Sequence, residues 1–178
     1  IVIANVFGAS ANADAFFVAF KIPNFLRRLF AEGAFSQAFV PVLAEYKAQG
    51  SAVAVKELVN RVAGVLGGTL LFVTGISIIA APLITTIFAP GFVSQPEKFY
   101  LTTVMTRITF PYLFLISMTG FCGAILNSYG RFALPAFTQV AQNLILIFIA
   151  IAIATHSANP GLALAIGVFV SGCVQMLM

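Results

Sequence analysis

Long apolar segments separated by short polar connectors run through the whole chain. The apolar segments are residues 1–7, 13–44, 62–88, 101–126, 132–154 and 162–178. A helix needs about 20 apolar residues to cross the hydrocarbon core of a bilayer. Turn-forming and helix-breaking residues lie in the connectors 8–12, 45–57, 89–98, 127–131 and 156–161. A transmembrane β-barrel would show alternating segments of about 10 residues instead. The pattern therefore predicts a bundle of about six membrane-spanning helices.

Composition supports the same class of protein. The chain has 178 residues, of which 61% are hydrophobic and 8% charged, whereas a soluble domain has about 25% charged residues. This excludes an ordinary soluble enzyme and a disordered chain, and predicts an all-α integral membrane protein. The net charge of +4 is spread along the sequence, so no basic stripe for nucleic acid is expected. Cys122 and Cys173 are isolated, so neither a metal site nor a cofactor site is expected.

The distribution of lysine and arginine predicts the orientation of the spans. The second and fourth connectors, with the start of the next span, carry Lys47, Lys56, Arg61 and Arg131, whereas the other connectors carry only Lys98. The side richer in cations should be cytoplasmic. The connector 8–12 is then expected outside, and the second segment should run inward.

The second segment, 13–44, is unusually charged for a membrane span. On an ideal helix, five of its polar side chains fall within about 80° of one another, which makes a stripe of Asp14, Lys21, Asn24, Arg28 and Glu32. Arg27 lies about 100° from Arg28 on the same wheel, but Pro23 is expected to kink the helix and could bring Arg27 into the stripe.

The stripe has the chemistry of an anion site. Paired arginines present forked donors that suit phosphate or carboxylate, Lys21 adds a cation, and Glu32 can hold Arg28 at i,i+4 when no ligand is present. A mid-membrane charge costs at least ~2.5–3.5 kcal/mol on insertion scales, so such charges usually have a function. The alternative is purely structural: the charges pair with acids on other helices or extend to the headgroups.

Other polar residues are weaker signals. Arg107, near the outer end of its span, is interpreted as reaching the outer headgroups. Gln139, Gln142 and Asn143 share a helix face, which favours hydrogen bonding between helices. No Ser/His/Asp set, HExxH motif or Gly-rich phosphate loop is present, so an enzyme is not predicted.

Three stretches carry a family resemblance. The sequences DAFFVAFKIPNFLRRLFAEGAFSQAFVPVLAEYK (14–47), APGF (89–92) and TRITFPYLFLISMTGFCGAILNSYGRFALPAF (106–137) resemble the MurJ (MviN) family of bacterial lipid II flippases. The likeness covers essentially the whole chain. It implies the fold of the multidrug/oligosaccharidyl-lipid/polysaccharide exporter superfamily, which has two six-helix bundles. Residues 1–178 would be the N-terminal bundle, without the start of its first helix and without the second bundle.

The resemblance also implies a function and roles for residues. Proteins of this family are thought to flip lipid II to the outer leaflet of the cytoplasmic membrane, for peptidoglycan assembly, by alternating access. Arg27 matches the cavity arginine associated with the diphosphate, and Lys21, Asn24 and Arg28 match cavity-lining or adjacent positions. The resemblance thus favours Arg27 as the inward residue, whereas the helical wheel favours Arg28.

Two acidic positions complete the implied site. Asp14 matches a position near the outer end of the second helix and is expected in an outer gate, and Glu32 matches a charged position lower in the cavity. The expected partners are lipid II, membrane lipids and other cell-wall synthesis proteins.

Three other classes stay open. The nearest is a related exporter of another lipid-linked oligosaccharide or of a drug, although a drug exporter would more often have an acidic cavity. A membrane enzyme acting on polyprenyl phosphates would need carboxylates for Mg²⁺ near the cytoplasmic face, and only Glu45 and Glu57 are there, without companions. In a channel or scaffold, the stripe would only join helices.

Overall fold

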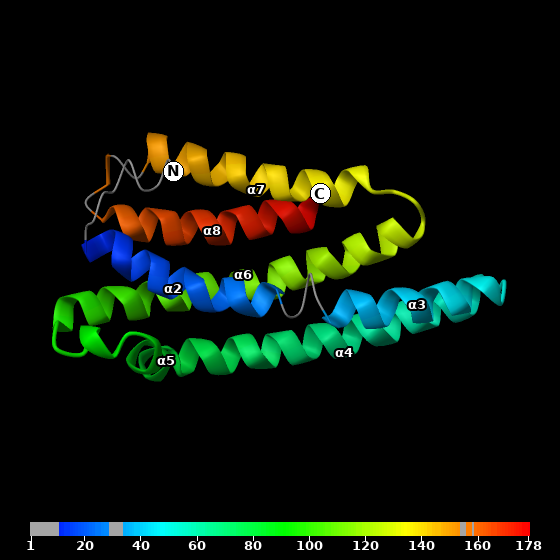
Figure 1. Cartoon of the computed structure of the whole chain (residues 1–178), viewed down its shortest axis with the longest axis horizontal. Helices are drawn as coiled ribbons and strands as arrows, with labels where there is room; N and C mark the ends of the chain where they lie inside the picture. The colour runs from blue at the N-terminus through cyan, green and yellow to red at the C-terminus, as the bar shows by residue number, and fades with distance from the viewer. Residues whose placement is uncertain (1–10, 29–33, 154–155, 158) are drawn as a thin grey trace.

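A computed structural model of the chain describes residues 11–28, 34–153, 156–157 and 159–178. The α-helices are α2 (Ala11–Arg27), α3 (Ala34–Ala48), α4 (Ala52–Ile79), α5 (Ala81–Phe88), α6 (Pro96–Ser128), α7 (Ala133–Ala152) and α8 (Pro160–Leu177), with a 3-10 helix, η2 (Pro90–Phe92). They form an elongated bundle in which most helices run along the long axis (Figure 1). The prediction of an all-α fold is confirmed.

The predicted number of about six spans is not confirmed. Within the described residues, α4, α6, α7 and α8 have the length and hydropathy to cross a membrane. The segment expected at 1–7 lies outside the described residues. The segment expected as one helix over 13–44 is two helices, α2 with 17 residues and α3 with 15. Its charges and Gly33, a poor helix former that directly precedes α3, weaken a continuous span here.

Two predicted boundaries of the next segment are wrong. Helix α4 begins at Ala52 and not at Val62, because Ser51 caps it by accepting a hydrogen bond from the backbone N–H of Ala54 at 3.3 Å. The segment 62–88 is also divided, since α4 ends at Ile79 and α5 begins at Ala81. Pro82 in the first turn of α5 explains the division, because proline has no N–H to continue the ladder of α4.

Side chains of α6 compensate for prolines in two other helices. Pro82 leaves the carbonyl of Ile78 without its helical donor, and Nε of Arg107 donates to that oxygen at 3.3 Å. Pro23 does the same to Ala19 within α2, and the hydroxyl of Thr109 donates to the Ala19 carbonyl at 3.2 Å. The freed carbonyls thus help to dock α2 and α4 on α6.

Helix α6 is the centre of the bundle and contributes to two hydrophobic clusters. One lies between α2, α6, α7 and α8 and includes Phe16, Tyr112, Ile149 and Val168. The other lies between α3, α4 and α6 and includes Leu43, Leu70 and Phe121. Small residues allow the helices to approach: a Cβ at Gly172 of α8 would lie 2.8 Å from the ring of Tyr112.

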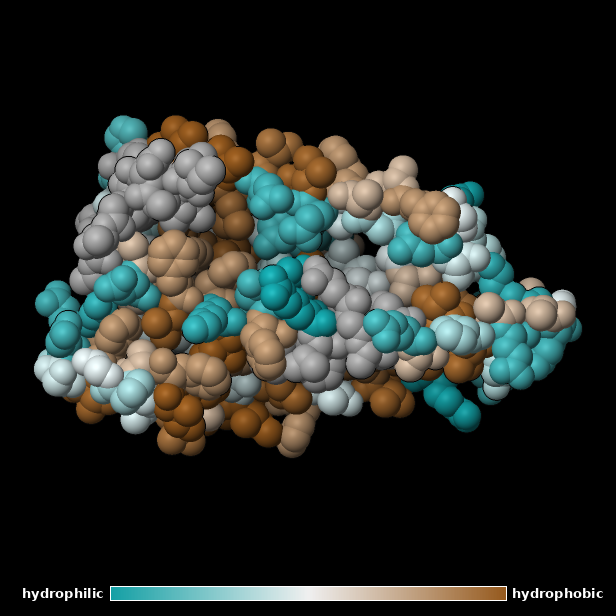
Figure 2. Space-filling model, viewed as in Figure 1, coloured by the Kyte–Doolittle hydropathy of each residue, from teal (hydrophilic) through white to brown (hydrophobic). Residues whose placement is uncertain are grey.

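The outside of the bundle is apolar, as a lipid-facing surface should be. Large exposed hydrophobic side chains lie along α4 and α7, among them Leu71, Phe72, Phe148 and Ile151. Figure 2 shows brown, hydrophobic residues along both long edges of the visible face. Lipid is the solvent that such a surface requires.

The grouping of connectors into two sides is confirmed. At one end, Lys47 of α3 donates to the backbone carbonyl of Ser128, and its Nζ lies 3.9 Å from the ring centroid of Tyr129. The second and fourth connectors therefore share a side. At the other end, Lys98 pairs with Asp14 at 2.9 Å, which joins the third connector to the start of α2. That the Lys47 end is cytoplasmic stays a prediction.

Candidate cationic cavity

The polar side chains of α2, together with that of Arg28 directly after it, differ in how far they are exposed. Lys21 and Arg28 are exposed, whereas Asn24 and Arg27 are half-buried. Figure 2 shows hydrophilic residues over α2 in the middle of the face, and a second hydrophilic patch over α7. Glu32 lies outside the described residues, so its expected contact with Arg28 is not described.

Arg27 lines a cavity between α2, α3, α6 and α7. The cavity has a volume of about 360 Å³. Nε of Arg27 donates to Oδ1 of Asn24 at 3.1 Å, a contact between residues three apart on one helix face. Asn24 therefore helps to orient the guanidinium. Of the two arginines, Arg27 lines this cavity, and its role as the residue that meets a ligand stays a prediction.

The wall that faces Arg27 comes from α6 and α7. Its polar members are Thr119 and Asn127 of α6 and Thr138 and Gln139 of α7. The two helices lie close at Gly123, where an added Cβ would be in van der Waals contact with Pro135, 3.4 Å from its Cβ. None of the described lining residues is acidic. The cavity therefore combines one cation with neutral polar groups, which suits an anion carrying a polar substituent.

Sequence reasoning missed this wall. Thr119 and Asn127 gave no signal because single threonines and asparagines are ordinary near the ends and inside of apolar helices. The glutamines of α7 did give a signal, but it was interpreted as hydrogen bonding between helices. That interpretation is confirmed for Gln142, which joins α7 to α6 and α8. Asn143 is exposed.

The joining contacts form a buried polar network. Nε2 of Gln142 donates to the hydroxyl of Tyr112 at 2.8 Å, and Nε2 of Gln175 donates to the carbonyl of Thr138 at 2.7 Å and to Oε1 of Gln142 at 3.4 Å. Gln139 donates to the same Oε1 of Gln142 at 3.3 Å. The exposed fractions of Tyr112, Gln142 and Gln175 are 0%, 5% and 2%. The network therefore locks the helices that carry the cavity wall.

Asp14 lies at the opposite end of α2 from Arg27 and forms an ion pair. Its Oδ2 is 2.9 Å from Nζ of Lys98, and the side chains of Lys98 and Asp14 are 14% and 59% exposed. The Lys98 ammonium also lies 4.3 Å from the ring centroid of Phe92. From the sequence alone, Lys98 was expected only as a charge in the third connector. The signal was present, since Asp14 and Lys98 are opposite charges expected on the same side.

Arg107 has a partner that sequence analysis did not foresee. It is exposed, as its interpretation as a headgroup contact requires, but its Nε is directed to the Ile78 carbonyl that Pro82 leaves free. It does not line the cavity beside Arg27.

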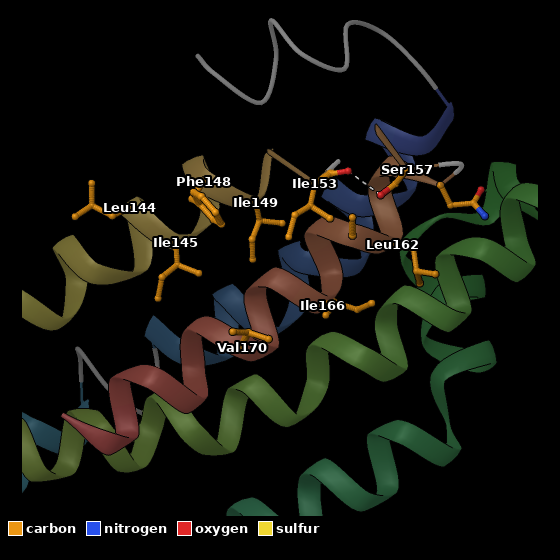
Figure 3. A pocket seen from close by; sticks show the side chains of 11 residues that line it. Leu144, Ile145, Phe148, Ile149, Ile153, Ser157, Leu162, Ile166 and Val170 are labelled. Atoms are coloured by element: carbon orange, nitrogen blue, oxygen red, sulfur yellow. Dashed lines mark hydrogen bonds between the residues drawn. The ribbon is translucent and has the colours of Figure 1, made fainter. Parts of the chain in front are cut away.

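A larger groove lies between α7 and α8. Its volume is about 750 Å³, and its walls are almost entirely aliphatic and aromatic, including Phe148, Ile149 and Ile166 (Figure 3). The Ser157 hydroxyl donates to the Ile153 carbonyl at 2.8 Å. Because none of the described residues that line this groove is charged, the groove does not suit an anion and resembles a lipid-facing surface.

The described residues do not contain a set of side chains that could bind a metal ion. No three His, Cys, Asp or Glu side chains come together there, and Cys122 and Cys173 are free thiols. That the protein binds no metal or cofactor stays a prediction.

Apolar spans, and a half-buried arginine at a cavity with neutral polar groups, define the class: a polytopic α-helical membrane protein. The model of one family, "Lipid II flippase MurJ", matches residues 3–178, and the chain belongs to that family.

Relatives of known name agree with this membership. The chain is 44% identical to a probable lipid II flippase MurJ of Haemophilus influenzae and 47% identical to the lipid II flippase MurJ of Burkholderia cenocepacia, in each case over 99% of its length. A solved structure of lipid II flippase MurJ in an inward closed conformation matches 99% of the chain with a TM-score of 0.83 and 27% identity. The chain spans about a third of each: 36% and 34% of the two relatives and 36% of the solved chain.

Proposed function

We propose that the protein containing this chain is a transporter, and not an enzyme, that flips lipid II from the inner to the outer leaflet of the bacterial cytoplasmic membrane. In this proposal, residues 1–178 form the N-terminal bundle, and a second bundle closes the other side of the transport path. Alternating access would expose the cavity first to the cytoplasm and then to the outside. Membership of the family and the names of the relatives support it.

The position of Arg27 is the observation that carries the proposal. A guanidinium that lines a cavity inside an apolar bundle is well placed to bind an anionic group of a ligand. The diphosphate that links undecaprenol to its sugar supplies that anion, and the planar fork of arginine matches two phosphate oxygens. Asn24 holds Arg27 at 3.1 Å, so the guanidinium is oriented before the ligand arrives.

Neighbouring charges of α2 are assigned supporting roles. Lys21 and Arg28, both exposed on the same helix, increase the positive potential along the path of the diphosphate. Glu32 compensates the cations when no substrate is bound. Asp14, through its ion pair with Lys98, belongs to an outer gate.

The decisive experiment uses the full-length protein in cells depleted of their native flippase. Newly made lipid II is tested for cleavage by an externally added reagent that does not cross the membrane. With wild-type protein we expect lipid II to become accessible. With Arg27→Ala we expect accessibility to be lost at an unchanged level of inserted protein, because no other described cation lines this cavity.

A matched control is Arg61→Ala, which removes an exposed arginine of α4 outside this cavity and should leave accessibility unchanged. Equal accessibility with Arg27→Ala and wild type would remove Arg27 from the mechanism. No accessibility with wild type would instead favour an exporter of another lipid-linked saccharide.

A further inference from the structure

The wall of α6 and α7 presents mainly hydrogen-bond acceptors to the cavity. The hydroxyl of Thr119 donates to the Leu115 carbonyl at 2.9 Å, and the hydroxyl of Thr138 donates to the Pro135 carbonyl at 2.7 Å. Each hydroxyl has a single proton, and in both residues a bond within the helix uses it. The two side chains that line the cavity therefore offer their oxygen lone pairs to a ligand.

The orientation of Gln139 follows from the buried network. The carbonyl of Thr138 can only accept, so the group of Gln175 that meets it at 2.7 Å must be Nε2. The same Nε2 lies 3.4 Å from Gln142, which must therefore present its oxygen there. Gln139 meets that oxygen at 3.3 Å and must use its nitrogen. Its Oε1 is left as a further acceptor on the residue that lines the cavity.

The opposite wall carries the positive charge of Arg27. The cavity therefore has one side for an anion and one side for groups that donate hydrogen bonds. The cavity has no partner for a cationic group on the ligand, because none of the described lining residues is acidic. The volume of about 360 Å³ equals that of about a dozen water molecules at ~30 Å³ each. This is room for a phosphate with one sugar ring.

We propose that Thr119, Asn127, Thr138 and Gln139 form a subsite for the sugar directly attached to the diphosphate, with their oxygens accepting hydrogen bonds from its hydroxyl and amide groups. This inference rests on the proposed function, since Arg27 must hold the adjoining phosphate. The charge selects a diphosphate, and the neutral wall selects what the diphosphate carries. A site built to pair with hydroxyl and amide hydrogens discriminates against a ligand that lacks them.

The test measures binding of two probes to the purified full-length protein. One probe is undecaprenyl diphosphate without a sugar, and the other is the same lipid bearing one N-acetylated sugar. The variant Thr138→Val keeps the shape of the side chain and removes only the hydroxyl. We expect it to weaken binding of the sugar-bearing probe several-fold and to leave the sugar-free probe unchanged. Gln139→Leu should weaken the sugar-bearing probe about tenfold, which is the loss of one good hydrogen bond.

Two further variants separate the possible failures. Asn143→Leu removes an exposed amide one turn from Gln139 that does not line the cavity, and it should change neither affinity. Arg27→Ala should weaken both probes equally. If Arg27→Ala changes neither probe, the proposed anion site fails. If Arg27→Ala weakens both probes but Thr138→Val and Gln139→Leu weaken both equally, or neither, the sugar subsite is overturned while the anion site stands.

Discussion

Two polar regions of this bundle differ in how their hydrogen bonds are completed. The network of Tyr112, Gln142 and Gln175 is buried and mostly pairs with itself, across three helices. The polar face of α2 is half-buried or exposed, carries charges, and has Arg27 at a cavity. The first region uses polarity to hold helices together. In the proposed function, the second region meets a ligand, which is how a binding site differs from a structural contact in a membrane.

The variant Arg27→Lys should have the largest effect, and it tests whether the face of α2 acts as a binding site. Lysine keeps the positive charge but has no planar fork, and its ammonium does not reproduce a bidentate contact with phosphate. We expect lipid II accessibility in cells to fall at least about tenfold, with thermal stability in detergent unchanged. Full activity of this variant would mean that the cavity needs only a positive charge.

Gln142→Leu should have the opposite profile. It removes the centre of the buried network and leaves the hydroxyl of Tyr112 and Nε2 of Gln175 with fewer partners. We expect the free energy of unfolding to fall by about 1–3 kcal/mol, measured by thermal or denaturant unfolding of the purified protein. Per inserted molecule, affinity for sugar-free undecaprenyl diphosphate should be nearly normal. Unchanged stability would show that the network contributes no cohesion.

Thr109→Val tests the compensation of a proline by another helix. The hydroxyl is shared between the carbonyls of Ala19 and Thr106, each at 3.2 Å, and its loss leaves the Ala19 oxygen in α2 without a donor. The expected loss of stability is about 1 kcal/mol. Thr102→Val is the control, because that buried hydroxyl bonds only within its own helix, to Lys98. Equal effects of the two changes would argue against any special role for Thr109.

Asp14→Asn should give only a small change in stability. Asp14 is 59% exposed, and exposed ion pairs contribute about 0–1 kcal/mol. A gate role would show in transport instead: the variant should alter the rate at which lipid II becomes accessible outside. Glu97→Gln, which changes an exposed carboxylate at the same end, should not. Matching rates for both variants and wild type would exclude Asp14 from the gate.

Much of the fold could be predicted because lipid imposes simple rules on a sequence. The apolar runs of α6, α7 and α8 were placed to within a few residues, since a span needs a continuous apolar segment. The end of α2 at Arg27, the start of α3 at Ala34 and the division between α4 and α5 at Ala80 were missed. Hydropathy continues across such breaks, and a single proline such as Pro82 is compatible with a kink as well as with an end. The donor from Arg107, on a distant helix, helps to satisfy the carbonyl at this interruption.

By itself, the sequence determined that this protein lies in a membrane, that α2 carries unusual charges, and that its relatives belong to one family. Those properties depend on composition and on local order along the chain. The tertiary structure decided that Arg27 and not Arg28 meets the cavity, that Lys98 pairs with Asp14, and that neutral groups of α6 and α7 face the arginine. Such contacts join residues more than 80 positions apart, as with Asp14 and Lys98. They depend on helix rotation and close approach, which no local pattern encodes.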